Sequence, residues 1–169
     1  DFWYYKLGTS DDPRWRRRLL MPSFDATGTL NFFVGRAIDD KRRPKYDNPD
    51  TPKKDFIFNE LNVDWTQRLV ICEGPLDLVK CGDNAVPLLG SMLTEDFLLF
   101  EKILLNRTPV ALALDCRDMK WKMQKYARKL AEYDLDVVIV DTGEKNDPGE
   151  MSKDEFKSAL ANARPWSWD

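Results

Sequence analysis

Three strands predicted from the sequence run directly into acidic residues. The apolar runs are 69–72, 110–114 and 136–140, and the acids that follow them are Glu73, Asp115 and Asp141. Further acids come soon afterwards, at Asp77, Asp118, Asp147 and Glu150. Carboxylates without His or Cys beside them are hard oxygen donors, which suit Mg²⁺ or Mn²⁺ rather than zinc. Two such ions can align an attacking hydroxyl with a leaving phosphate oxygen. The alternative is that each acid only caps the helix that follows it.

Other metal and nucleophile chemistry has little support in the composition. The chain contains no histidine, which removes every His-based general base and zinc site. Its three cysteines, Cys72, Cys81 and Cys116, are odd in number and lack the Cys-x-x-Cys spacing of zinc sites. We therefore expect buried thiols in a reducing compartment, with neither a disulfide framework nor zinc.

The elements that position the acids alternate between strands and helices. Strands are predicted at 69–72, 85–88, 110–114 and 136–140. Four helices are predicted. The first ends at Cys81, the second follows an N-cap at Thr94, the third covers 119–133, and the fourth runs from a cap at Ser152 to about Ala161. This alternation predicts an α/β fold with a parallel sheet flanked by helices on both faces. The carboxyl ends of parallel strands meet at one edge of the sheet, so the acids should gather there.

The first third of the chain has a different character. Two short strands, at about 19–24 and 29–34, flank a turn at 25–28 and predict a β-hairpin. The segment 41–54 contains three prolines and is predicted to be an irregular connector. Residues 1–54 carry 12 Lys and Arg against 8 Asp and Glu, whereas residues 55–169 carry 14 against 21. The basic part therefore suits an anionic partner, and the acidic part suits metal chemistry.

Length and composition restrict the class of protein. A chain of 169 residues with 43% hydrophobic and 12% aromatic residues has enough apolar side chains for a packed core of about one domain. Its apolar runs are far shorter than a membrane span requires. The chain begins with Asp and shows no signal-peptide pattern, so we expect a natural start further upstream and a cytoplasmic location without membrane contact.

The most specific motif is the segment 70–77, in which Glu73 is followed by Gly74, Pro75, Leu76 and Asp77. Glycine allows a tight turn after the acid, and proline suits the first turn of a helix. Together with Asp115 after its strand and the Asp147-Pro148 pair, this segment resembles the Toprim domain. That domain is shared by bacterial-type primases, type II and type IA topoisomerases and some nucleases.

Segments outside the Toprim part resemble the primase branch in particular. They are the arginine-rich run 14–22, the hairpin that ends in Gly35-Arg36, the Pro-Lys-Tyr-Asp-Asn run 44–48, and the segment 87–95. The resemblance extends from about Arg14 to Glu155. It implies a Toprim-type sheet preceded by a small, β-rich, basic subdomain. The expected division is 1–66 for that subdomain, 67–163 for the Toprim domain and 164–169 for a tail to which the sequence assigns no structure.

The primase resemblance implies a role for each candidate residue. Glu73 would be catalytic and linked to metal, and Asp115, Asp118 and Asp147 would be further ligands of Mg²⁺ or Mn²⁺. Asp77 and Glu150 would act behind these ligands. The residues expected to contact template backbone or nucleotide are Arg36, Lys45, Asn48, Lys54 and Arg18. The partners implied are a single-stranded DNA template, ribonucleoside triphosphates and a replicative helicase bound through regions outside this chain.

Two departures from the family pattern keep other functions open. The family usually has Asp-x-Asp after the strand that precedes Asp115, whereas Arg117 stands at the second position here and Asp118 follows it. Gly149 also replaces an acid that often follows Asp-Pro. These changes affect the expected second metal ion. The alternatives to a primase core are a Toprim nuclease and a non-catalytic Toprim relative that binds nucleic acid.

Overall fold

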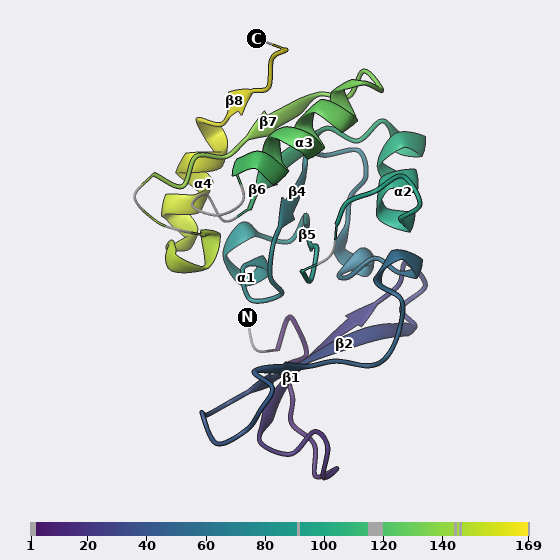
Figure 1. Cartoon of the computed structure of the whole chain (residues 1–169), viewed down its shortest axis with the longest axis vertical. Coiled ribbons are helices and arrows are strands. Elements are labelled where there is room, and N and C mark those ends of the chain that lie inside the picture. Colours follow the sequence, from purple (N-terminus) through teal and green to yellow (C-terminus); the bar gives the residue numbers. More distant parts are fainter. Residues whose placement is uncertain (1–2, 91, 115–119, 144, 146, 169) are drawn as a thin grey trace.

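The computed structural model describes residues 3–90, 92–114, 120–143, 145 and 147–168. It contains a small antiparallel sheet built from the N-terminal third and a larger mixed sheet flanked by helices (Figure 1). This confirms the predicted α/β class. The predicted domain boundary at residues 66 and 67 stays a prediction.

The antiparallel sheet has three strands in the order β1-β2-β3. They are β1 (Arg18–Phe24), β2 (Leu30–Ala37) and the two-residue β3 (Tyr46–Asp47). The predicted turn is held by Asp25, whose carboxylate accepts hydrogen bonds from the amides of Thr27 and Thr29. The hairpin prediction is therefore confirmed, with β3 as an added short strand inside the predicted connector.

The mixed sheet has five strands in the order β5-β4-β6-β7-β8. They are β4 (Leu69–Cys72), β5 (Ala85–Pro87), β6 (Val110–Ala113), β7 (Val137–Ile139) and β8 (Arg164–Pro165). The first four in spatial order are parallel, and β8 pairs antiparallel with β7. The C-terminal segment thus forms an edge strand that the sequence pattern did not reveal.

The helices follow the predicted order with shifted ends. They are α1 (Leu78–Cys81), α2 (Leu98–Asn106), α3 (Lys120–Ala131) and α4 (Lys153–Ala161), with 3₁₀ turns at Lys53–Asp55, Glu60–Asn62 and Pro148–Glu150. Ser152 caps α4 through a reciprocal capping box with Glu155, as predicted. The cap predicted at Thr94 is wrong: its hydroxyl bonds to Asp96, and α2 begins four residues later, at Leu98. No helix in the described part of the chain is long and apolar enough to span a membrane.

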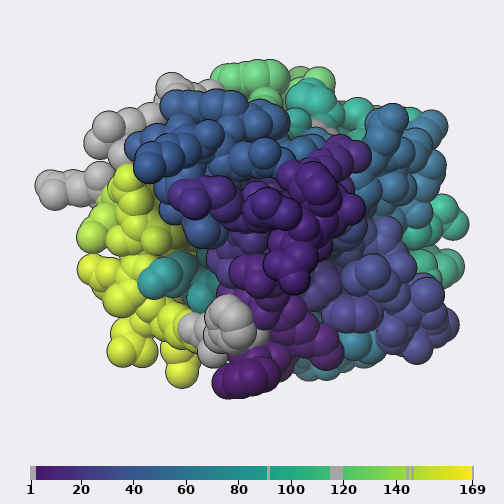
Figure 2. Space-filling model, turned by 90° about the horizontal axis from the view of Figure 1, so that it is seen from below, coloured from purple at the N-terminus to yellow at the C-terminus, as the bar shows by residue number. Residues whose placement is uncertain are grey.

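The two central strands are buried on both faces. Leu69 and Ile71 of β4 face the cluster that α2 and α3 cover, whereas Val70 and Cys72 face the opposite cluster. The second cluster contains side chains of α1 and α4 together with Met21, Phe32 and Val34 of the hairpin, and with Phe56 and Phe58. The N-terminal hairpin is therefore packed against the sheet as part of its core. Figure 2 shows this N-terminal part spread over one end of the molecule.

Asn59 ties the hairpin to the edge of the mixed sheet. Its backbone N–H donates to the Ser23 hydroxyl (2.9 Å), and its side-chain amide donates to the carbonyls of Asp83 (3.1 Å) and Ala85 (2.9 Å). The residue is 5% exposed and has a left-handed backbone, with φ of 69°. A buried amide with these partners fixes the orientation of the hairpin relative to β5.

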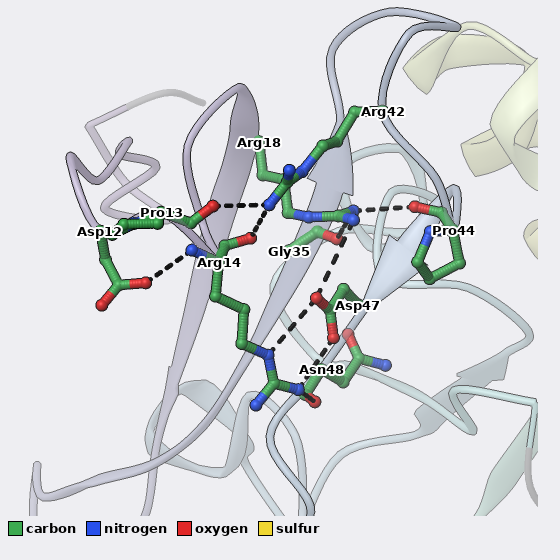
Figure 3. Close-up of polar contacts among 9 residues, drawn as sticks. All are labelled: Asp12, Pro13, Arg14, Arg18, Gly35, Arg42, Pro44, Asp47 and Asn48. Carbon is green, nitrogen blue, oxygen red and sulfur yellow. Dashed lines mark hydrogen bonds and ion pairs between the residues drawn. The ribbon is translucent and has the colours of Figure 1, made fainter.

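Arg18 connects the strands of the small sheet to the connector. Its side chain is 1% exposed, and its guanidinium donates to the carbonyls of Pro44 (2.9 Å) and Gly35 (3.3 Å) (Figure 3). The Asp47 carboxylate lies 3.9 Å away and also pairs with Arg14 at 2.9 Å. A Cβ at Gly35 would lie 2.8 Å from the Asp47 carbonyl, so only glycine allows this close approach. One buried cation thus joins β1, β2 and the connector.

We expect Arg18→Ala to destabilise the protein by about 3 kcal/mol, because it leaves the carbonyls of Gly35 and Pro44 without their donor and removes a buried side chain from the small sheet. The measurement is urea unfolding followed by circular dichroism. Arg16→Ala is the matched control, since Arg16 is exposed two residues away. Equal effects of the two substitutions would contradict the structural role of Arg18.

Candidate functional site

Glu73 begins the loop that connects β4 to α1. Its backbone carbonyl accepts a hydrogen bond from the amide of Leu89 (3.0 Å), in the loop after β5. One oxygen of its carboxylate is buried. The loops after β4 and β5 therefore hold Glu73 between them at the carboxyl edge of the sheet, where the sequence predicted a functional acid.

Asp77 and Asp147 converge on Gly149. The Asp77 carboxylate accepts a hydrogen bond from the Gly74 amide (2.8 Å), and Asp147 caps the turn Pro148–Glu150 by accepting from the Glu150 amide (3.1 Å). A Cβ built on Gly149 would lie 2.7 Å from an Asp77 oxygen and 2.9 Å from an Asp147 oxygen. The absence of a side chain at position 149 therefore lets two carboxylates from distant segments meet.

The nearby carboxylates affect the pKa of Asp77. The pKa of Asp77 is raised to about 6 from an ordinary value of 3.8, mainly by burial and also by the charges of Asp147 and Glu73. The Gly74 hydrogen bond and the charge of Arg36 act in the opposite direction. Three predicted acids and one predicted arginine thus lie within electrostatic reach of one another.

A cavity of about 350 Å³ opens beside Glu73 and joins the two sheets. Its lining residues are Val34, Tyr46, Asn48, Lys53, Glu73, Gly74, Pro75, Leu89 and Gly90. The hairpin and the connector supply one wall, and the loops after β4 and β5 supply the other. The cavity brings Asn48 to the same space as Glu73, although 25 positions separate them in the sequence. A larger cavity of about 440 Å³ lies apart, between α3 and β8.

Lys53 is a residue of this cavity that sequence reasoning missed. Its ammonium donates to the carbonyl of Leu89 (2.5 Å), whose amide in turn donates to Glu73. The sequence prediction named the neighbouring Lys54, which is exposed and lies 3.6 Å from Asp96. Nothing in the composition distinguishes the two lysines. The turn Lys53–Asp55 and its position beside the distant Leu89 decide which of them faces the cavity.

The predicted basic residues have different surroundings. Arg36 donates to the Tyr46 hydroxyl (2.7 Å) and lies near Asp77, whereas the Lys45 side chain is exposed. Arg18 is buried within the small sheet, where its guanidinium donates to the carbonyls of Gly35 and Pro44. Direct contact with nucleic acid is incompatible with that burial, so Arg18 supports the segment that carries Tyr46 and Asn48.

The described acids alone do not form a metal centre. Within the part of the chain that the structure describes, no three His, Cys, Asp or Glu residues are grouped closely enough to hold an ion. The predicted ligands Asp115 and Asp118 lie outside the described residues. The candidate donors are all carboxylates, and two of them already approach one point above Gly149, which fits a hard divalent cation. Glu150 is exposed at the end of the same turn.

Comparison with known proteins bears on the predicted resemblance. No protein-family model matches the chain. A DNA primase from Listeria innocua is 26% identical over 167 residues, which cover 89% of this chain and 27% of the relative. The chain therefore spans about a quarter of the length of this curated relative.

Several solved structures have a fold similar to that of this chain. One of them is a crystal structure of the zinc-binding and RNA polymerase domains of the Aquifex aeolicus primase. It matches with a TM-score of 0.72 at 23% identity, over 98% of this chain and 46% of that one. The fold is that of a bacterial primase catalytic core. A DnaG primase catalytic domain bound to single-stranded DNA matches with a TM-score of 0.66 at 23% identity, over 94% of this chain and 56% of that one. The resemblance to bacterial-type DNA primases is thus confirmed.

The raised pKa of Asp77 predicts a specific pH dependence of stability. Because the folded state holds this proton more tightly than the unfolded chain, the contribution of Asp77 is present below about pH 4 and is lost as the pH rises through about 6. Asp77→Asn should remove this fall and make the protein more stable than the wild type above pH 6. Denaturant unfolding from pH 4 to 8 in EDTA tests this. A wild-type profile that matches the variant would contradict it.

The close approach of two carboxylates to Gly149 predicts how a substitution there affects metal binding. Gly149→Ala should weaken Mn²⁺ binding about tenfold, because the new methyl group forces the Asp77 and Asp147 carboxylates apart. Isothermal titration with Mn²⁺ measures the change. Gly8→Ala is the control, since a Cβ there meets no atom within 4 Å. Unchanged affinity in Gly149→Ala would show that the two carboxylates do not act together.

Proposed function

We propose that this chain is the catalytic core of a DNA primase, a nucleotidyltransferase that makes short RNA primers on single-stranded DNA. The single observation that carries the proposal is the cavity that joins Glu73 of the mixed sheet to Asn48 and Tyr46 of the basic N-terminal part. A nuclease must hold only a nucleic-acid strand against the acids, whereas a polymerase must hold both a template and a nucleotide there. The matching fold and the sequence relative, both described as primase, support the same conclusion.

The residues of the cavity suggest a division of labour. Glu73 is the catalytic acid beside the primer hydroxyl, held in place by Leu89 and, through Leu89, by Lys53. Arg36 and Asn48 contact the phosphates of the nucleotide or of the template. Exposed Lys45 and Lys54 add sequence-independent attraction for the template backbone.

The same proposal assigns the metal ligands. Glu73, Asp147 and, outside the described residues, Asp115 and Asp118 would hold Mg²⁺ or Mn²⁺. When bound, such an ion supplies positive charge to the triphosphate and lowers the pKa of a hydroxyl. Asp77 and Glu150 lie beside these ligands, where Asp77 crowds Asp147 and orients it through the turn at Gly149.

The two alternatives differ in what they need from the basic part. A Toprim nuclease would shorten DNA through the same acids, and a non-catalytic relative would bind nucleic acid without metal. Neither of them needs a separate nucleotide to be held in the cavity that Asn48 and Tyr46 share with Glu73. A primase core requires it, because the incoming nucleotide is held from one side and attacked from the other.

The test is primer synthesis on single-stranded DNA with ribonucleotides and Mg²⁺ or Mn²⁺. The wild-type chain should yield short RNA products, and Glu73→Gln should lower the yield at least a hundredfold while leaving the unfolding midpoint unchanged. Glu101→Gln, on the exposed face of α2, is the matched control and should retain full activity.

Each other outcome has a defined meaning. Full activity in Glu73→Gln would remove Glu73 from the mechanism. Degraded template in the wild-type lanes, lost in Glu73→Gln, would identify the nuclease. Absence of both products together with absence of Mn²⁺ binding would favour the non-catalytic relative.

A further inference from the structure

A second concave surface lies near β8, at the other end of the strand order from β5 and the Glu73 cavity. Two adjoining hollows, of about 440 and 540 Å³, share Gln124, Trp166 and Ser167. They lie between α3 and the C-terminal segment around β8, at the edge of the sheet farthest from β5 (Figure 1). We call this region, from Lys120 to Arg128 on α3 and from Arg164 to Trp168, the α3–β8 surface.

The α3–β8 surface is positively charged in an acidic part of the chain. Its two hollows are lined by four basic residues and one acidic residue: Lys120, Lys125, Arg128, Arg164 and Asp141. The remainder of the chain after residue 54 has an excess of acids, so this concentration of cations is local. Among the described residues Lys125 forms no ion pair, and Arg128 forms one, with Glu132 (3.7 Å). An anionic ligand is the complementary partner.

Exposed tryptophans accompany these cations. Trp121, Gln124, Lys125 and Arg128 are spaced i, i+3, i+4 and i+7, which places them on one exposed face of α3. Trp121 is 58% exposed and Trp168 is 63% exposed. Both rings lie beside the cations of this surface, and the flat faces of such rings suit unpaired bases.

The tryptophans of the tail are held in position. The indole N–H of Trp166 donates to the Gln124 side chain (2.8 Å), and its backbone amide donates to the Val137 carbonyl (2.9 Å). Trp168 packs edge-to-face on Trp166, with ring centroids 4.8 Å apart. The aromatic platform is therefore fixed against α3 and β7 before any ligand arrives, which lowers the entropic cost of binding.

We propose that the α3–β8 surface binds single-stranded nucleic acid, with Lys125 and Arg128 on phosphates and Trp168 stacked on a base. Alternating positive charge and aromatic faces are the combination by which proteins hold unpaired strands without sequence preference. An acidic peptide would match the charge but would leave the tryptophan faces unused.

The surface is placed to extend the proposed primase site. Asp141 and Gly143, which line the first hollow, follow β7 at the carboxyl edge of the sheet, and Glu73 follows β4 at the same edge. A strand that crosses this edge passes from the basic N-terminal part, over the acids, to α3. The inference rests on the proposed function for the identity of the strand as template, but binding itself needs neither metal nor ribonucleotide.

The test is fluorescence anisotropy with a labelled oligothymidylate of about twelve nucleotides, in EDTA and over a series of salt concentrations. Trp168→Ala should weaken binding about fivefold or more, which is the usual loss of one stacked base. Lys125→Ala should weaken it and reduce the slope of log K against log salt by about 0.7, as expected for one lost phosphate contact on a single strand. The controls are Trp3→Ala and Lys157→Ala, since both side chains are exposed on other parts of the molecule.

The outcomes separate this inference from the proposed function. Wild-type affinity and slope in both test variants would overturn the α3–β8 surface even if primers are made. Equal losses in test and control variants would also overturn it, because the effect would not be local. Weaker self-association of Trp168→Ala in sedimentation velocity, without loss of oligonucleotide affinity, would assign the surface to a second copy of the chain. Selective loss of affinity would support it even in a chain that makes no primers.

Discussion

The structure depends on a parallel sheet whose central strands are buried on both faces. β4 and β6 have no polar face to offer, because one side packs on α2 and α3 and the other on α1, α4 and the hairpin. Polar chemistry can then occupy only the strand ends. Glu73 and its neighbours lie at the carboxyl edge for this reason, and the loops that carry them are held by hydrogen bonds between Cys72, Glu73 and the segment after β5.

The same burial requires the N-terminal part to contribute side chains to the core. Met21, Phe32 and Val34 complete one of the two cores, and Asn59 fixes their register relative to β5. Once the hairpin is docked in this way, the connector must pass beside the Glu73 loop. Packing of the hairpin therefore creates the cavity in which a basic segment and an acidic segment meet. The buried Arg18 stabilises the connector that lines this cavity, through its hydrogen bond to the Pro44 carbonyl.

The distribution of charge follows the fold rather than the order of residues. Acids lie close enough together to raise the pKa of Asp77, which costs stability at neutral pH, and such a cost is common where a site is kept ready for a cation. Positive charge flanks this centre on both sides, from the N-terminal part and from α3. An extended polyanion matches that arrangement better than a small substrate does.

The sequence by itself determined the α/β class, the four parallel strands, the hairpin and the cap at Ser152, because periodicity and turn residues act locally. It also indicated that the acids Glu73, Asp77 and Asp147 would gather, since strand ends share one edge. It misplaced the start of α2, because the Thr94 hydroxyl found a local partner in Asp96. Only the tertiary structure decided that Lys53 rather than Lys54 faces the cavity, that Arg18 is buried, and that the tail forms β8 with Trp166 on α3. Each of those outcomes depends on contacts between residues far apart in the chain, which no local pattern encodes.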